Sequence, residues 1–369
     1  MHKYFSINDQ IFSSRLFKKL SNRNETWVIH RLVCQPKLLK DTWKDMKKVP
    51  LDSGSPISVH GRDPMEKVIF ACMAPPYGSG LNLYVLLFAA SIRTFAGTLS
   101  DSPIWVLVPK SENEISEQTK KQLVSLEVKV TPFEIDPDVS KFPFAGNVLA
   151  AATAESLAKE NTTFLAWMGL DTLIIDEPTL FLLGEDKTAG YRPVHHTLIG
   201  SIYEEPPDPF WELIYQKCHV TEDKIFPMKT HVDHNTLRPY FNAGHLIVRP
   251  EKGLFQTWWD YFKKLYHDPC FEEYYEKNEL YTIFIHQAVL TGVILSTTER
   301  QELQELPFTY NYPLHLYYES PRDMRPQNVN DLVTVRYEEP KVFEKIPFCD
   351  PLKSWLTDQV NSLSKANLM

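Results

Sequence analysis

The sequence lacks several features by which secreted domains and membrane proteins are recognised. Its five cysteines lie far apart, and no two of them form a CxxC pair. This spacing argues against a disulfide framework and a zinc knuckle, and it favours a reducing, cytoplasmic location. The chain begins without an apolar signal core, and its longest apolar stretch, residues 81–92, is too short to cross a bilayer. We therefore expect no transmembrane segment. The cysteines are Cys34, Cys72, Cys218, Cys270 and Cys349.

Basic charge is scarce as well. The net charge is −8, and lysine and arginine form no long block, so we expect no nucleic-acid partner. Neither GxGxxG nor GxxxxGK followed by Ser or Thr occurs, which argues against Rossmann dehydrogenases and P-loop proteins. An anionic ligand would have to be held by a few local groups. The 43% apolar and 23% charged composition is typical of a chain that buries a large core.

Strand-like and helix-like segments alternate through most of the chain. We expect an N-terminal arm and linker over residues 1–65, an α/β domain over residues 66–345 and a C-terminal helical tail over residues 346–369. The alternation predicts right-handed crossovers and a mainly parallel sheet flanked by helices. The expected strands cover residues 68–73, 104–108, 128–130, 166–176, 241–248 and 332–336. The expected helices include residues 147–159, 206–218, 250–266 and 281–290.

Residues 166–176, AWMGLDTLIID, read as one buried strand that contains an acid in its middle. A buried carboxylate is costly unless another group pairs with it. Asp171 therefore needs a partner from elsewhere in the chain.

Three blocks of sequence carry a resemblance to a known family. They are residues 91–108, residues 151–171 with an Ala-rich helix before the strand, and residues 240–250, YFNAGHLIVRP. In this order they resemble the nucleotide-sugar glycosyltransferases of the GT-A fold, in particular the glycogenin-like and related retaining families. The resemblance implies a GT-A-like single sheet. It also implies transfer of a hexose from a nucleotide-diphosphate sugar to a hydroxyl acceptor, which would be a glycan, a protein or a small molecule.

The resemblance also implies a metal site at a DxD motif, and this chain departs from it. Gly169 stands at the first Asp of that motif and Asp171 at the second, while Arg336 stands where related families place a histidine ligand. One carboxylate offers too few ligands for Mg²⁺ or Mn²⁺. We expect Arg336 to replace the metal, pairing with Asp171 when the site is empty and with a diphosphate when it is filled. Mn²⁺ or Mg²⁺ stays the alternative if the DxD strand is misaligned.

Other residues complete the expected site. The loop after the first strand would hold the nucleotide, with Gly169 and Gln287 beside the donor, and the FNAG strand would contact sugar. The rival hypothesis is a degenerate GT-A fold that has lost its chemistry and acts as a sugar- or partner-binding module. The loop residues are Ala74, Tyr77, Gly78, Ser79 and Gly80, and the sugar contacts are Asn242, Gly244 and His245.

Overall fold

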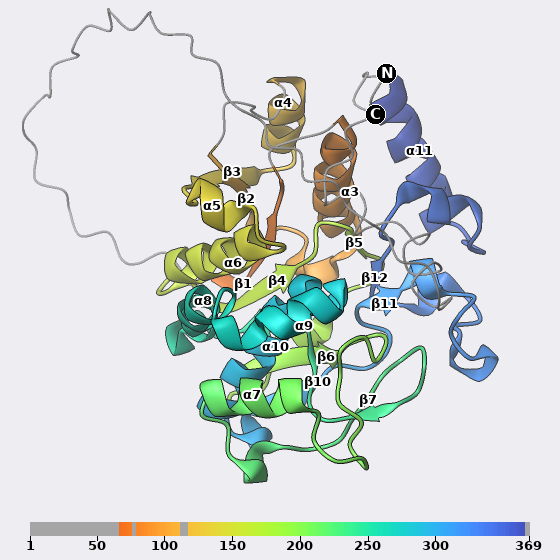
Figure 1. Cartoon of the computed structure of the whole chain (residues 1–369). Coiled ribbons are helices and arrows are strands. Elements are labelled where there is room, and N and C mark those ends of the chain that lie inside the picture. The colour runs from red at the N-terminus through yellow and green to blue at the C-terminus, as the bar shows by residue number, and fades with distance from the viewer. Residues whose placement is uncertain (1–65, 76–78, 111–116, 366–369) are drawn as a thin grey trace, which may run out of the picture.

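A seven-stranded sheet crosses the centre of the computed structural model, which describes residues 66–75, 79–110 and 117–365 (Figure 1). The strand order is β10-β6-β9-β4-β1-β2-β3. β9 runs antiparallel to β4 and β6, and the other neighbours in this sheet are parallel, which confirms the predicted mainly parallel sheet. The strands are β1 (Glu66–Met73), β2 (Ile104–Pro109), β3 (Val128–Phe133), β4 (Thr162–Met168), β6 (Ala189–Pro193), β9 (Phe241–Val248) and β10 (Leu303–Glu305).

Helices cover both faces of this sheet (Figure 1). Residues of β1 alternate between two cores: Ile69 and Ala71 pack with α6, α7, α8 and α10, whereas Val68 and Phe70 pack with α3, α4 and α11. Strands buried on both faces explain the continuous apolar runs in the sequence. The helices are α3 (Ser79–Phe95), α4 (Glu117–Ser125), α5 (Pro137–Ser140), α6 (Ala145–Ala158), α7 (Pro209–Lys217), α8 (Leu254–Leu265), α9 (Glu272–Lys277), α10 (Glu279–Thr297) and α11 (Leu352–Lys365).

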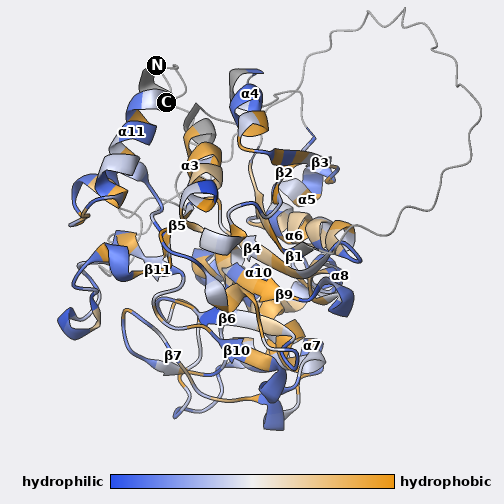
Figure 2. Cartoon of the chain, turned by 180° about the vertical axis from the view of Figure 1, so that it is seen from behind, coloured by the Kyte–Doolittle hydropathy of each residue, from blue (hydrophilic) through white to orange (hydrophobic). Residues whose placement is uncertain are grey.

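The helix α10 is long and apolar enough to cross a membrane by length and composition alone. However, 67% of its apolar window is buried inside the protein. Figure 2 shows the apolar colour gathered around α10 and the strands in the middle of the molecule. A helix that is hydrophobic on all sides and enclosed by other elements is typical of a core helix.

The stretch expected to be one strand, residues 166–176, is two strands in two sheets. β4 ends at Met168, and β5 (Thr172–Ile174) pairs instead with β12 (Thr334–Arg336), which also pairs with β11 (Tyr312–Pro313). Between them the N–H of Thr172 donates to the carbonyl of Gly169 at 3.1 Å. Apolar residues stand on both sides of this turn, so the sequence pattern does not reveal it. A further pair of short strands, β7 (Met228–Lys229) and β8 (Thr236–Leu237), completes the described sheets.

The helix expected in the tail is α11, which packs on α3 through Trp355 and Phe95, whose ring centroids are 5.1 Å apart. Leu352 and Leu356 belong to the core on that face. The tail helix is therefore part of the same packed body as the sheet. The predicted arm and linker, residues 1–65, lie outside the described residues.

Candidate functional site

The partner of Asp171 is Arg336. Nη2 of Arg336 lies 2.6 Å from Oδ1 of Asp171, and the side chains are 16% and 5% exposed, respectively. The expectation that the two residues face each other is confirmed. A buried carboxylate beside a guanidinium keeps its negative charge in a place where an unpaired charge would be costly.

Backbone pairing fixes the two residues relative to each other. Arg336 ends β12 opposite Thr172 of β5, and the N–H of Tyr337 donates to the carbonyl of Asp171 at 3.0 Å. Asp171 itself comes three residues after the end of β4. The pair therefore lies at the carboxyl edge of the parallel strands, where open α/β sheets bind their ligands.

Two glycines form the floor beneath Arg336. The N–H of Gly169 donates to the carbonyl of Gly244 at 2.8 Å, so the end of β4 and the start of β9 lie side by side. A Cβ on Gly169 would stand 2.7 Å from Cζ of Arg336, and one on Gly244 would collide with its Nη1. The N–H of Gly244 also donates to Oδ1 of Asn242 at 3.0 Å. The structure thus brings together five of the predicted site residues.

Burial decides the protonation of the acidic and basic neighbours. Burial and then the charge of Asp171 raise the pKa of Glu338 to about 9, so this carboxyl is protonated at neutral pH. Burial and then the positive charge of Arg336 lower the pKa of His245 to about 3, so its ring is neutral. The working charges at this place are those of Asp171 and Arg336.

Several buried polar atoms of the site have no hydrogen-bond partner among the described residues. They include Oδ2 of Asp171, Nε of Arg336 and Oε2 of Glu338. Glu338 also has a left-handed backbone, with φ of 58°, which is rare for a residue with a long side chain. Unpaired buried polar groups and local strain cluster at functional sites.

Three predicted residues are buried, and their expected contacts with a ligand stay predictions. His245 has no exposed surface and packs on Phe181 with ring centroids 5.6 Å apart, so it reaches no ligand in this arrangement. Gln287 lies in the middle of α10, where its Oε1 accepts the N–H of Ala243 at 2.9 Å. Ala74 is fully buried. The register of β6 and β9 shifts near Tyr191, and this bulge upsets the side-chain alternation from which contacts of β9 would be read.

The nucleotide loop is described only in part. Tyr77 and Gly78 lie outside the described residues, while Ser79 and Gly80 open α3. Their expected contacts with a nucleotide stay predictions.

The donor groups at Asp171 do not fit the metal that the resemblance implies. A guanidinium nitrogen already lies on its Oδ1, and Glu338 beside it is protonated at neutral pH. Within residues 66–75, 79–110 and 117–365, no three His, Cys, Asp or Glu side chains could hold a metal ion together. Mg²⁺ and Mn²⁺ need several oxygen ligands in a regular shell.

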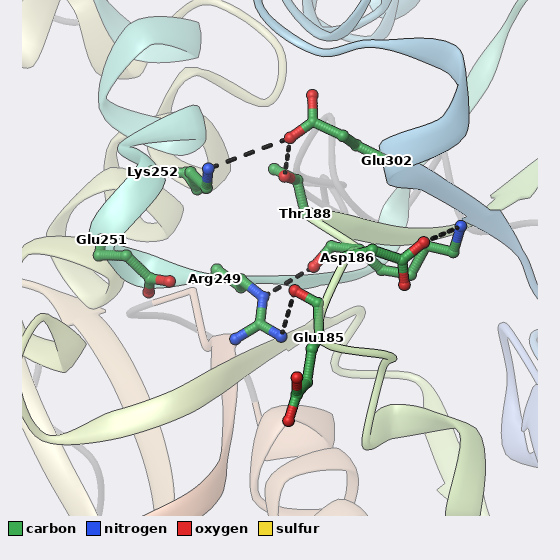
Figure 3. A pocket seen from close by; sticks show the side chains of 8 residues that line it. Glu185, Asp186, Thr188, Arg249, Glu251, Lys252 and Glu302 are labelled. Carbon is green, nitrogen blue, oxygen red and sulfur yellow. Dashed lines mark hydrogen bonds and ion pairs between the residues drawn. The ribbon is translucent and has the colours of Figure 1, made fainter.

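In the described part of the chain, a hollow of about 300 Å³ lies at the opposite, amino edge of the sheet (Figure 3). Thr188 just before β6, Arg249 just after β9 and Glu302 just before β10 line it. Arg249 donates to the carbonyls of Lys187 at 2.7 Å and Gly184 at 3.1 Å, and Thr188 donates to Glu302 at 2.9 Å. Because these polar groups already bond to one another, the hollow is not the candidate site.

Sequence reasoning missed Glu338 and a group of histidines near Arg336. His195 and His196 are adjacent in the sequence, and His231 lies two residues before Asp233, but neither spacing predicts a role at this site. In the structure Asp233 accepts hydrogen bonds from Thr197 and Thr230 and serves its own loop. The sequence carries no sign that Glu338 and these histidines lie near Arg336, because only the order of the strands brings them to one edge of the sheet.

The chain is similar to known glycosyltransferases. Residues 78–297 match the model of a family described as the Rhodobacterales glycosyltransferase domain. The galactosyltransferase LgtC in complex with donor and acceptor sugar analogues has a TM-score of 0.44 and 15% identity, over 80% of this chain and 95% of that chain. Mouse xyloside xylosyltransferase 1 has a TM-score of 0.40 and 12% identity, and the match covers 74% of this chain and 98% of that chain. GlyE of Streptococcus pneumoniae TIGR4 has a TM-score of 0.41 and 9% identity, and the match covers 83% of this chain and 64% of that chain. No curated protein sequence matches.

Proposed function

The chain belongs to the Rhodobacterales glycosyltransferase domain family, and we propose that it transfers a hexose from a nucleotide-diphosphate sugar to a hydroxyl acceptor. The observation that carries the proposal is the ion pair of Arg336 and Asp171 on its glycine floor. It lies at the carboxyl edge of the sheet, next to the end of β4, where this fold type binds ligands.

Arg336 supplies the positive charge that a departing diphosphate requires. In the transfer, the bond from the anomeric carbon to the diphosphate oxygen breaks, a bond to the acceptor oxygen forms, and the acceptor hydroxyl loses its proton. The electron pair of the broken bond leaves with the diphosphate. A guanidinium in a site that excludes water stabilises this growing charge most where it is already positioned. Its planar fork matches two phosphate oxygens.

Asp171 positions the guanidinium in the empty site. The more exposed member of the pair is Arg336, so an incoming diphosphate meets the cation before it meets the carboxylate. Oδ2 of Asp171 has no partner among the described residues and is suited to accept a hydroxyl of the ribose or of the sugar. Asn242, whose Oδ1 accepts the N–H of Gly244, lies beside the ion pair of Asp171 and Arg336.

Binding in this proposal does not depend on a divalent metal, because Arg336 takes the position and the charge of one. The experiment is calorimetry of the full chain with UDP, GDP, ADP and CDP and with their sugars, in EDTA and in manganese. Loss of binding in EDTA would mean that another carboxylate, such as Asp176, holds a metal.

The variant for this experiment is Arg336→Met, which removes the charge and keeps most of the volume. Its matched control is Arg322→Met, which removes an exposed arginine from a short turn of 3-10 helix, residues 322–324. We expect a nucleotide at a hundred times its dissociation constant to stabilise the protein by about 2.7 kcal/mol, and Arg336→Met to lose this effect. No stabilisation by any of these nucleotides at millimolar concentration would refute the proposal. Binding without transfer or donor hydrolysis would instead favour the sugar- or partner-binding module.

A further inference from the structure

The carboxyl edge of the sheet extends beyond Asp171. β6 and β10 are parallel to each other, and both run in the same direction as β4, because each of β4 and β6 is antiparallel to β9. All three strands therefore end at one edge. His195 follows the end of β6 by two residues, and Phe308 follows the end of β10 by three. Topology places both residues on the side of the sheet that holds Arg336.

Phe308 is a large apolar side chain left open at this edge. It is 39% exposed, and its ring is stacked on that of His231 with centroids 6.0 Å apart and an angle of 11° between the planes. His231 is only 5% exposed and also meets the ring of Tyr312, in β11, with centroids 5.0 Å apart. β11 pairs with β12, the strand that carries Arg336. The ring of Phe308 thus lies parallel to the buried ring of His231, which packs in turn on Tyr312.

Two more histidines connect His231 and Phe308 with Arg336. His315 follows β11, whose Pro313 is the register partner of Arg336. The rings of His315 and His195 meet with centroids 6.4 Å apart. The carbonyl of His195 accepts the N–H of Val232, next to His231, at 2.9 Å. We call the four residues His315, His195, His231 and Phe308 the edge band.

The three histidines of the edge band are neutral hydrogen-bonding groups. Burial is the main cause that lowers the pKa of His231 and of His315 to about 4, and it lowers the pKa of His195 as well. A neutral imidazole offers one donor and one acceptor, as a hydroxyl does. Nε2 of His195, Nε2 of His231 and Nδ1 of His315 have no hydrogen-bond partner among the described residues. Unmet buried polar groups favour a polar ligand.

We propose that the edge band binds the acceptor, and that the acceptor is a carbohydrate whose ring packs on Phe308 while its hydroxyls bond to His195 and His315. The proposal rests on the proposed transfer reaction and names the class of its acceptor. As residues, His195 and His315 are half-buried, but Nε2 of His195 and Nδ1 of His315 are buried, so each ring rotates toward the ligand when it binds. His231 packs behind the ring of Phe308 and supports it.

The chemistry of the edge band separates a carbohydrate from other acceptors. A sugar ring presents an apolar face of C–H groups together with several hydroxyls on its rim, which matches one aromatic platform with several neutral donors and acceptors. A serine or threonine side chain presents a single hydroxyl. An anionic acceptor would need cations, and the imidazoles of the edge band carry no charge at neutral pH.

The probes are the methyl glycosides of glucose, galactose, mannose and xylose, together with a serine-containing peptide. Their binding to the full chain is followed by saturation-transfer NMR, first alone and then with the nucleoside diphosphate that binds in calorimetry. The variants are Phe308→Ala and Phe308→Tyr, and the matched control is Leu182→Ala, which truncates an apolar side chain of the same 39% exposure outside the edge band.

We expect at least one glycoside to bind, Phe308→Ala to weaken it by about tenfold or more, and Phe308→Tyr and Leu182→Ala to leave it nearly unchanged. The nucleotide affinity of Phe308→Ala should equal that of the unaltered protein. Nucleotide binding without glycoside binding, equal glycoside binding by Phe308→Ala, or Phe308-dependent binding of the peptide alone would overturn the carbohydrate site and leave the donor site standing. Phe308-dependent glycoside binding without any nucleotide binding would instead support the carbohydrate site and remove the transfer reaction.

Discussion

The guanidinium of Arg336 occupies the space that a side chain on Gly169 would need, since a Cβ there would stand 2.7 Å from Cζ. The two residues are therefore mutually dependent. By the resemblance, Gly169 would stand at the first carboxylate of the DxD motif and Arg336 at its later ligand. Loss of the first side chain makes room for the cation, and the cation meets the remaining carboxylate of Asp171. One rearrangement accounts for both departures.

Restoring both family residues together should restore a metal site. We expect Gly169→Asp alone to be destabilising, because its Cβ collides with Arg336, whereas Gly169→Asp with Arg336→His provides two carboxylates and an imidazole. Manganese titration by calorimetry or paramagnetic relaxation should show binding by the double variant and none by the parent. A double variant that folds but does not bind manganese would disprove the alignment of residues 166–176 with the DxD strand of the family.

The ion pair itself is tested by a double-mutant cycle. Arg336→Ala should destabilise the fold by about 3 kcal/mol, because it leaves Asp171 buried and unpaired. Asp171→Asn should cost less, since Arg336 is the more exposed partner. The double variant should recover part of the stability lost in Arg336→Ala but none of the nucleotide binding. Denaturant unfolding measures the cycle, and effects that add within about 0.5 kcal/mol would show that the residues do not interact.

The glycine floor should be sensitive to a single methyl group. In Gly244→Ala the new methyl would displace Nη1 of Arg336, so we expect nucleotide affinity to fall by about tenfold or more. Gly146→Ala is the control, because a Cβ there meets only the flexible end of Met73, at 3.3 Å. Calorimetry measures the nucleotide affinity of both variants. Equal affinities would mean that the guanidinium is free to move off the floor.

Stability should fall as the pH rises above neutrality. Burial raises the pKa of Glu155 to about 7 and that of Glu338 to about 9, both above the values of the unfolded chain. A carboxyl with a raised pKa stabilises the fold at low pH and loses this contribution as the pH rises through the folded value. Between pH 6 and pH 8, Glu155 should remove about 1 kcal/mol of unfolding free energy and Glu338 about 2 to 3 kcal/mol, because Glu338 stays protonated in the folded state up to about pH 9. Urea titrations across this range measure the slope.

The glutamine variants Glu155→Gln and Glu338→Gln separate the two contributions. Glu155→Gln should flatten the pH dependence between about pH 5 and pH 7, and Glu338→Gln should flatten it up to about pH 9, so only the second variant changes the slope between pH 7 and pH 9. A slope that both variants leave unchanged would assign the pH dependence to other groups.

Gln287 should prove to be structural. Its Oε1 accepts the N–H of Ala243, and Thr291 on the next turn of α10 accepts the N–H of Phe241 at 3.2 Å. Gln287→Leu should therefore cost about 1 to 3 kcal/mol of stability by leaving a buried N–H unpaired, with nucleotide affinity of the folded protein unchanged. Gln216→Leu, at an exposed position of α7, is the control. A specific loss of donor affinity in Gln287→Leu would return this residue to the donor site.

The sequence predicts the centre of the site better than its surroundings. Asp171 and Arg336 could be paired because two positions of a known ligand pattern are altered in a complementary way. The turn after Met168 was not predicted, because apolar residues stand on both sides of it. His245 was expected at the sugar from the resemblance alone, and the packing of its ring on Phe181 depends on a contact that only folding creates. The edge band was not predicted because its members, from His195 to His315, meet only through strand order.

The long sequence separation of β5 and β12 also has a consequence for biosynthesis. Asp171 and its cation are 165 residues apart in sequence, so a ribosome has released most of the chain before Arg336 emerges. Until β12 docks on β5, the carboxylate stays uncompensated and disfavours closure of the surrounding core. Contacts of such long sequence separation form slowly. The nascent protein should therefore depend on the segment that carries β12 to finish folding, and a chain that stops before Thr334 should stay sensitive to proteases.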